Sequence, residues 1–281
     1  MLHKFMRGIA PVFALAAAIG AAGCDGNISI DGERGVALAD LDYEGKSPTG
    51  VVLAGPDNLV IKDGGTLAID VSGDPTAISA LRFTLSDETL GIMRSKGGVD
   101  AGSNGKATVT VTLPALQKLT LAGSGTINAA SLAGASEVVI AGSGTARTDR
   151  VESASLKVTI AGTGTYRAAG KVDSLELTLA GSGTGAMAGL QAEDAEVTIA
   201  GSGNASFASD GRVNATVMGS GNVTVRGEAK CTIKSLGSGT LTCERGIDGA
   251  DSASAPNGPA TPARPAGPVP PPTPEAPATP E

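Results

Sequence analysis

The sequence "VTIAGSGN", from Val197 to Asn204, recurs in close copies along the chain. Its Gly-Ser/Thr-Gly triplet occurs seven times, with successive spacings of 19, 20, 19, 20, 18 and 18 residues. A period this regular is typical of stacked repeat architectures. We expect each triplet to form a tight turn in which both glycines adopt positive φ values. The turn glycines are Gly123, Gly125, Gly142, Gly144, Gly162, Gly164, Gly181, Gly183, Gly201, Gly203, Gly219, Gly221, Gly237 and Gly239.

The residues before each triplet alternate in polarity. In the copy above, Val197 and Ile199 are aliphatic and Thr198 between them is polar, and the other copies keep this order with few exceptions. Such a period of two predicts a strand with one buried face. A second short strand follows each triplet, as in "NVTVR" from Asn222, so that a repeat holds two or three strands separated by turns. The pattern predicts an all-β fold, a parallel β-helix of about seven coils. A phosphate-binding loop fits poorly, since such a loop occurs once and opens a helix.

The rest of the chain divides around this repeat. Residues 116–246 hold the repeats, and residues 50–115 contain non-repeating strand-like runs that we expect to form an N-terminal β cap. Solenoids need such caps because each repeat packs only on its neighbours. Residues 24–49 are predicted to be a linker. Residues 247–281 are rich in Pro and Ala and predicted to be disordered, as an inert tail, a spacer or a recognition segment.

The first 23 residues read as an export signal. Lys4 and Arg7 precede an uncharged, mostly apolar run that is short for a membrane span. The run ends in "AAGC", which resembles the lipobox of bacterial lipoproteins, and this resemblance implies that Cys24 is lipidated. The alternative is ordinary cleavage after a small residue, which would release a soluble exported protein.

The chain has three cysteines, an odd number for an exported protein. If Cys24 carries lipid, Cys231 and Cys243 remain to form a disulfide across the last triplet. Two free thiols are the alternative.

Composition excludes several classes of function. A net charge of −7 without Lys/Arg clusters argues against nucleic-acid binding. The only histidine is His3, within the predicted signal, so no histidine-dependent triad, zinc site or general base is expected. We therefore expect no metal, no cofactor and no enzymatic activity.

Carboxylates after the second strand leave one alternative open. Some β-helix proteins cleave polysaccharides with paired carboxylates, and the candidates are Asp149, Glu152, Asp173, Glu193, Asp194, Glu196 and Asp210. Neighbouring cations make either inter-coil salt bridges or a ligand patch: Arg147, Arg150, Arg167, Lys171, Arg212 and Arg226. Aromatic residues, on which sugar rings usually stack, make up only 2% of the chain.

Residues 50–245 resemble a known family. "GVVLAGPDNLVIKDGGTLAIDVSGD" from Gly50, then "LRFTL", "GIMR" and the units "IAGSGT" and "MGSGNV", are similar to the DUF2807 family of auto-transporter adhesin heads. The resemblance implies a right-handed β-helix, export to the cell envelope, frequent lipid anchoring and homo-oligomers such as trimers. Many members carry Asp after the second glycine, where this chain has Thr or Asn, which argues against a cation-binding ladder.

These observations together predict a non-enzymatic envelope lipoprotein. We expect the lipid anchor to hold it on the inner or outer membrane, facing the periplasm or the cell surface. Its β-helical head is expected to act as a scaffold or adhesin-like module for a protein or glycan partner. The alternative is a β-helix that binds or cleaves polysaccharide.

Overall fold

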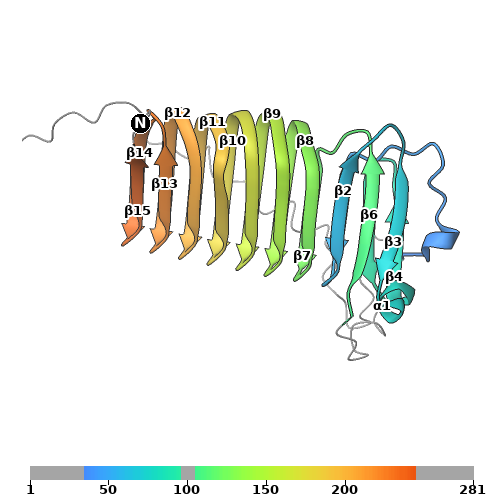
Figure 1. Cartoon of the computed structure of the whole chain (residues 1–281). Coiled ribbons are helices and arrows are strands. Elements are labelled where there is room, and N and C mark those ends of the chain that lie inside the picture. The colour runs from blue at the N-terminus through green and yellow to red at the C-terminus, as the bar shows by residue number, and fades with distance from the viewer. Residues whose placement is uncertain (1–34, 96–104, 245–281) are drawn as a thin grey trace, which may run out of the picture. The chain divides into compact units, whose positions relative to one another are not determined.

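The computed structural model describes residues 35–95 and 105–244. Within them lie fifteen strands, a short α-helix and a 3-10 turn (Figure 1). The predicted signal, Cys24 and the Pro-rich tail lie outside the described residues. The elements are η1 (Leu38–Asp40), β1 (Gly50–Ala54), β2 (Asn58–Asp63), β3 (Ala68–Gly73), α1 (Pro75–Ala80), β4 (Leu81–Leu85), β5 (Thr89–Arg94), β6 (Ala107–Leu113), β7 (Lys118–Gly123), β8 (Thr126–Gly142), β9 (Thr145–Gly162), β10 (Thr165–Gly181), β11 (Thr184–Gly201), β12 (Asn204–Gly219), β13 (Asn222–Arg226), β14 (Lys230–Gly237) and β15 (Thr240–Glu244).

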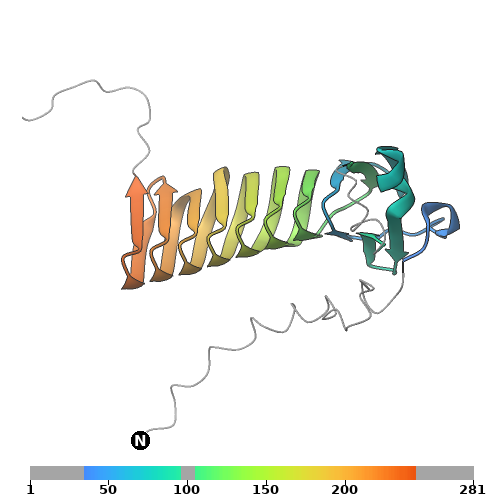
Figure 2. The same ribbon diagram turned by 90° about the horizontal axis from the view of Figure 1, so that it is seen from below.

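The repeats form a parallel β-solenoid of about seven turns, as the sequence predicts. Each coil pairs in parallel with the next, and equivalent residues lie opposite one another: Val158 pairs with Leu177, which pairs with Val197. Figure 2 shows the coils stacked one beside the next. The coils differ from the expected two or three separate strands, because β8 to β12 each run unbroken for 16 to 18 residues between triplets. Between triplets each coil turns at a second corner. The strand continues there without a break, and its pairing with the neighbouring coil shifts in register.

The core is narrow and almost entirely aliphatic. The alternating positions before the triplets are fully buried, as at Val197 and Ile199 (both 0% exposed), and each such side chain contributes about 1.5–3 kcal/mol on burial. Tyr166 is the largest buried side chain, and it donates a hydrogen bond of 3.1 Å to the Thr148 hydroxyl on the neighbouring coil. Burial raises the pKa of Tyr166 above its ordinary value of 10.0.

The two glycines of each triplet have different roles, and this corrects the expectation that both adopt positive φ. The first glycine does so, with φ of 129° at Gly201 and 114° at Gly181. The second glycine does not adopt positive φ, but it is buried against the preceding coil in the first six triplets. A Cβ on Gly183 would lie 2.6 Å from Ile160 Cγ2 and 3.0 Å from the carbonyl of Gly164. The second glycine is therefore required for close approach between coils.

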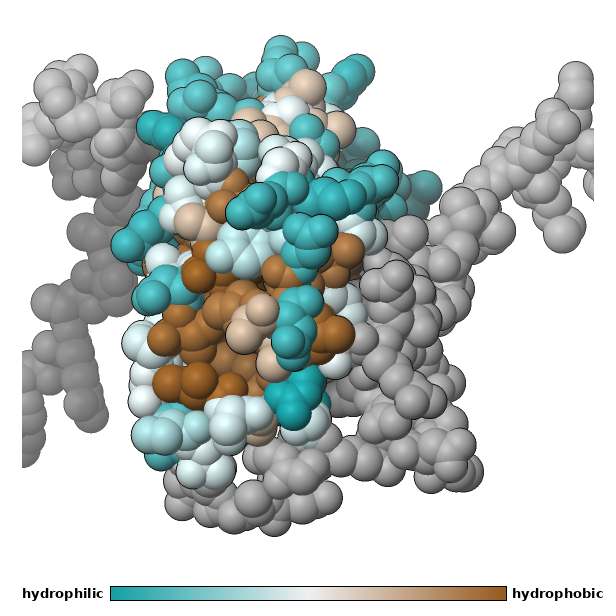
Figure 3. Space-filling model, turned by 90° about the vertical axis from the view of Figure 1, so that its right-hand side faces the viewer, coloured by the Kyte–Doolittle hydropathy of each residue, from teal (hydrophilic) through white to brown (hydrophobic). Residues whose placement is uncertain are grey.

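The N-terminal region combines a cap with further coils, which are stacked out of chain order. β1 pairs in parallel with both β7 and β5, and β2 pairs in parallel with β8 and β6. The β1–β2 coil therefore lies between the repeats and the β5–β6 coil, although β5 and β6 follow it in the chain. Beyond them, β3 and β4 pair antiparallel with β6 and β5, and α1 connects these two outer strands. Figure 3 looks at this outer end.

A buried ion pair joins the two out-of-order coils. Asp57 stands where the repeats have their second glycine, since β1 and β2 pair with β7 and β8 on either side of it. Its carboxylate is 1% exposed and accepts hydrogen bonds from Arg94 Nε at 2.7 Å and from the amide of Ala107 at 2.8 Å. Arg94 also donates to the carbonyl of Gly105 at 2.9 Å. The hydrogen bond to Asp57 raises the pKa of Arg94. Because Arg94 belongs to β5 and Ala107 to β6, the Asp57 carboxylate connects the triplet corner of one coil to both strands of the next.

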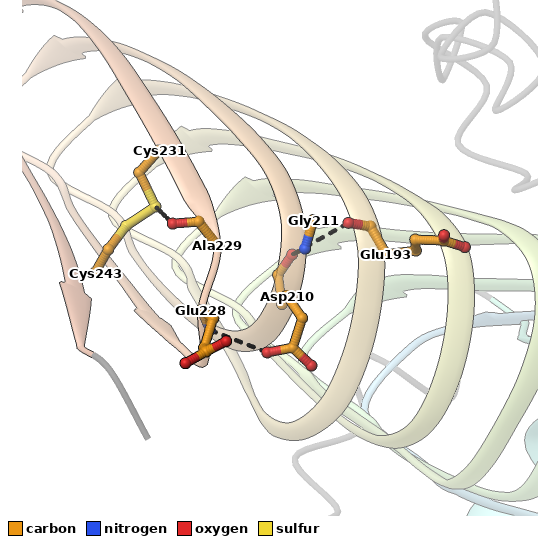
Figure 4. The surroundings of a disulfide bond; sticks show 8 residues. Glu193, Asp210, Gly211, Glu228, Ala229, Cys231 and Cys243 are labelled. Atoms are coloured by element: carbon orange, nitrogen blue, oxygen red, sulfur yellow. Dashed lines mark hydrogen bonds between the residues drawn. A yellow bond between two sulfur atoms is a disulfide. The ribbon is translucent and has the colours of Figure 1, made fainter. Parts of the chain in front are cut away.

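The C-terminal coil carries a disulfide between Cys231 and Cys243 (Figure 4). Cys231 lies in register with Val213, and Cys243 lies in register with Val225. Both valines are fully buried in the preceding coil. The disulfide therefore occupies the core positions of the last coil that the structure describes.

Part of the stretch predicted as a linker packs on the N-terminal region. Val36 forms an antiparallel bridge with Phe83 of β4, and Leu38, Leu41 and Tyr43 contact the core. Among the described residues, no helix is long and apolar enough to cross a membrane.

Candidate interaction surface

One face of the solenoid carries three columns of outward side chains, which we call the threonine face. The central column is mostly threonine, and on the first six coils each of its residues lies between two buried aliphatic positions of its strand. The parallel register places equivalent residues about 4.8 Å apart from coil to coil. The central column is Thr120, Val139, Thr159, Thr178, Thr198, Thr216 and Lys234.

The columns on either side of the threonines differ in character. One consists of alanines on the first five coils and of two larger, exposed apolar residues on the last two: Ala122, Ala141, Ala161, Ala180, Ala200, Met218 and Leu236. The other consists of charged and polar residues: Lys118, Glu137, Lys157, Glu176, Glu196, Asn214 and Thr232. Lys157 and Glu176 of this column form an exposed ion pair of 3.0 Å. The face thus offers hydroxyls, methyl groups and charges in three parallel lines.

A second feature is an open groove at the corner where the register shifts. Asp173, Glu193 and Asp210 lie at this corner on successive coils, with Lys171 and Gln191 beside them. The groove has a volume of about 320 Å³. Asp210 accepts a hydrogen bond from Gln191 Nε2 at 2.8 Å and another from the amide of Glu228 at 3.0 Å. Figure 4 shows Glu193, Asp210 and Glu228 on neighbouring coils of this corner.

The other carboxylates singled out in the sequence lie elsewhere. Asp194 lies beside the groove residues but pairs with Arg212 at 2.9 Å, and the hydrogen bond from this guanidinium lowers the pKa of Asp194. Asp149 pairs with Arg147 at 2.7 Å. Glu196 belongs to the charged column of the threonine face. Glu152 is exposed on β9, in register with Lys171. The structure therefore brings only three of the seven candidates together in the groove.

Several of the predicted cations make salt bridges between coils. Arg212 pairs with Asp194, Arg150 lies 3.8 Å from Asp63, and Arg226 lies 4.0 Å from Glu244. All of these pairs are exposed, and such pairs contribute little to stability. Lys171 lines the groove without an ion pair in the part of the chain that the structure describes.

The groove shows no sign of a metal centre. Over residues 35–95 and 105–244, no group of three His, Cys, Asp or Glu side chains is placed to hold a metal ion. The carboxylates of the groove are spread over separate coils, and two of the groove's polar side chains, Gln191 and Asp210, bond to each other. The arrangement suits hydrogen bonding to a polar ligand better than tight chelation.

Sequence reasoning did not find the groove as a unit or the Asp57–Arg94 pair. The groove depends on a two-against-one register at Asp210 and Gly211, opposite Glu193. The isolated Gly211 within a strand was the one available signal of this bulge, since such a glycine is typical of a bulge. The signal for Asp57 was available, because "AGPDN" aligns with "AGSGT" and places Asp at a glycine position.

The sequence matches the family described as "Putative auto-transporter adhesin, head GIN domain" (DUF2807) over residues 47–229. The chain belongs to the DUF2807 family. No curated protein matches the sequence.

Solved structures share the fold of this DUF2807 chain. A putative adhesin from Bacteroides fragilis is 20% identical with a TM-score of 0.64, over 72% of this chain and 94% of that one. A putative lipid binding protein from Parabacteroides distasonis is 20% identical with a TM-score of 0.55, over 71% and 94% of the two chains. A putative adhesin from Parabacteroides merdae is 18% identical with a TM-score of 0.55, over 73% and 99%. At these identities the likeness concerns the fold alone.

Proposed function

We propose that this chain is a non-enzymatic, adhesin-like module of the cell envelope that binds its partner through the threonine face. The observation that carries this proposal is the register of the coils, which repeats the same three outward side chains along the stack. A flat surface of this kind favours an extended partner with its own repeat, such as a glycan chain or a protein strand. The family description supports an adhesin-like role.

The test is a binding screen of the mature chain on an array of glycans and envelope proteins. The double variant Thr159→Glu/Thr198→Glu places two charges on the threonine face, two coils apart. The matched control, Ala186→Glu/Thr224→Glu, places the same charges on outward positions after the triplet corner, also two coils apart. We expect saturable binding that only the first variant abolishes. Equal loss in both variants would contradict the assignment to this face.

A second candidate function is binding or cleavage of a polysaccharide in the groove. The observation in its favour is the concave site lined by Asp173, Glu193 and Asp210. The variant Glu193→Gln/Asp210→Asn removes two of these charges, and Asp149→Asn removes a carboxylate outside the groove. Release of oligosaccharides by the wild type, lost only in the groove variant, would replace the first proposal with this one.

We further propose that Cys24 anchors the chain to a membrane through lipid, after export and cleavage of the signal. The sequence "AAGC" supports this proposal. Cys24→Ser should move the protein from the membrane fraction to the soluble fraction, and continued membrane partition would contradict lipidation. Sedimentation of the soluble form would also measure whether the head forms a trimer, the assembly we propose from the family resemblance.

A further inference from the structure

The side of the solenoid that follows the triplet corners carries an outward column with two charged members. The residues of this column lie in register from coil to coil: Thr110, Val60, Asn128, Arg147, Arg167, Ala186, Ser206, Thr224 and Thr242. Both charged members are exposed arginines, and they lie opposite each other on the neighbouring strands β9 and β10 (Figure 1). We call Arg147 and Arg167 the arginine pair.

The arginine pair lacks the charge matching that two other arginines of the solenoid have. Arg212 lies in register with Asp194, and Arg226 lies in register with Glu244. In the arginine pair two cations lie in register instead, on strands about 4.8 Å apart. Like charges directly opposite one another repel, so an anion bound between the two guanidinium groups would relieve this repulsion.

The molecule itself supplies one carboxylate for these two cations. Arg147 Nε donates a hydrogen bond of 2.7 Å to Asp149 Oδ1, and both side chains are exposed. Over residues 35–95 and 105–244, Arg167 takes part in no ion pair. The next member of the column, Ala186, offers no charge. The guanidinium of Arg167 is therefore available to an anion from outside the chain.

A column of hydroxyl and amide side chains runs beside the arginine pair. Thr145 and Thr165 lie two residues before the arginines, and therefore on the same outward face of their strands. The column comprises Asn58, Thr126, Thr145, Thr165, Thr184, Asn204, Asn222 and Thr240. Its last three members are linked by side-chain hydrogen bonds of 3.1 and 2.7 Å. Hydroxyls and amides both donate and accept hydrogen bonds, so the column suits a ligand rich in hydroxyl groups.

The chemistry of the two columns selects the class of ligand. The planar guanidinium group matches the oxygens of a carboxylate, sulfate or phosphate. A nucleic acid fits poorly, because a duplex carries one charge per about 1.7 Å and needs many cations along its length. A lipid surface also fits poorly, because it needs a large apolar face, and Val60 and Ala186 are the apolar members of the column. A polysaccharide with separated anionic groups offers both the charge and the hydroxyls.

We propose that the arginine pair binds a carboxylate or sulfate group of an acidic polysaccharide, while Thr145 and Thr165 form hydrogen bonds with hydroxyls of the same chain. This site lies on a different side of the coils from the threonine face, and it goes beyond the function proposed above. Because the site is exposed and depends on charge, its affinity falls as the salt concentration rises.

Binding of dextran sulfate, with neutral dextran as the matched probe, tests this proposal. The protein is the full mature chain with Cys24→Ser, in a buffer of low ionic strength. We expect saturable binding of dextran sulfate and none of dextran. Arg147→Gln/Arg167→Gln should weaken binding at least about tenfold, because charge-assisted hydrogen bonds are lost. Polygalacturonate, which carries carboxylates in place of sulfates, should lose affinity in the same variant.

The matched control removes two arginines that already have carboxylate partners. Arg212→Gln/Arg226→Gln changes the net charge by the same amount and should leave the affinity within about twofold of the wild type, since exposed ion pairs engage these cations. A second pair of variants adds a charge instead. Ala186→Glu places a carboxylate in register with Arg167 and should compete with the ligand, whereas Thr178→Glu adds the same charge on the threonine face and should have a smaller effect.

Four outcomes would overturn the proposal. The first is the absence of saturable binding to both acidic polysaccharides, and the second is equal binding of dextran and dextran sulfate. The third is an equal loss of affinity in the two double arginine variants, which would reveal an effect of net charge alone. The fourth is tighter binding of single-stranded DNA or anionic phospholipid vesicles through the same arginines, which would assign another class of partner. None of these results bears on the threonine face, because Thr159→Glu/Thr198→Glu leaves the arginine pair intact.

Discussion

At the scale of single residues, the paired glycines of the triplet show how one motif meets two constraints. The first glycine turns the chain with positive φ, and the second allows the backbone of the next coil to come close. The sequence predicts that these positions are turns, because the triplets recur at a regular spacing along the chain. The close approach could not be predicted, since it depends on the residue of the neighbouring coil that the missing Cβ would meet.

Alanine substitutions in the fourth triplet separate the two constraints. Gly181→Ala forces positive φ on a residue with a Cβ and should lower the free energy of unfolding by about 1–3 kcal/mol. Gly183→Ala keeps its φ but overpacks against Ile160 and should also cost about 1–3 kcal/mol. Ser182→Ala, on the exposed residue between them, should change the free energy by less than about 0.5 kcal/mol in urea unfolding. A neutral Gly183→Ala would contradict the packing role.

The Asp57–Arg94 pair predicts a strongly asymmetric mutational response. Arg94→Met leaves the Asp57 carboxylate buried without its partner and should cost about 3–5 kcal/mol. Adding Asp57→Gly removes that charge and restores a triplet-like corner. The double variant should recover part of this loss, because the Ala107 amide still loses its acceptor. Urea unfolding of the two variants measures the difference, and a double variant no more stable than Arg94→Met would show that the buried charge is not the cause.

Tyr166 predicts a loss of stability at high pH. Burial raises its pKa in the folded state above the ordinary value of 10.0, so the unfolded chain loses the proton first. The stabilisation is complete below about pH 10 and declines as the pH rises further. Tyr166→Phe should cost about 1 kcal/mol at pH 8, through loss of the hydrogen bond to Thr148, and should remove this part of the alkaline decline. Urea midpoints at pH 8 and pH 11 test both statements, and parallel declines in the two proteins would refute the second.

At the scale of elements, the strands could be predicted but their order in space could not. Alternation marks β6 as a strand as clearly as those of the repeats, and β1 and β2 lie in short strand-like runs, whereas β5 has no alternation that predicts it. Their placement follows from which edges pair, and the non-repeating sequence of this region gives no register. The chain therefore inserts the β5–β6 coil outside the β1–β2 coil, an arrangement visible only in the pairing.

The last coil predicts a local response to reduction. The disulfide closes a loop with a sequence separation of 12, for which the chain-entropy estimate is about 3 kcal/mol. Cys231→Ser/Cys243→Ser should accelerate hydrogen exchange in β14 and β15, because their core positions are otherwise poorly filled. Exchange in β9 and β10, which lie between complete coils, should stay unchanged. Uniform acceleration along the solenoid would contradict this local role.

At the scale of the whole molecule, the surface is a consequence of the repeat. Any sequence that keeps the core columns in register must also align its outward side chains, so the threonine face could be expected from the period. The groove could not, because Asp173, Glu193 and Asp210 meet only through the irregular register at their corner. The repeat pattern does not identify the partner of such a surface, which has to be found by binding experiments.

Binding through the threonine face is tested by the dissociation constant for the tightest ligand from the array. It is compared among the wild type, Thr159→Glu/Thr198→Glu and Glu193→Gln/Asp210→Asn. We predict at least tenfold weaker binding for the threonine-face variant, which corresponds to about 1.4 kcal/mol, and wild-type affinity for the groove variant. Binding that survives charges on the threonine face but is lost in the groove variant would contradict the account.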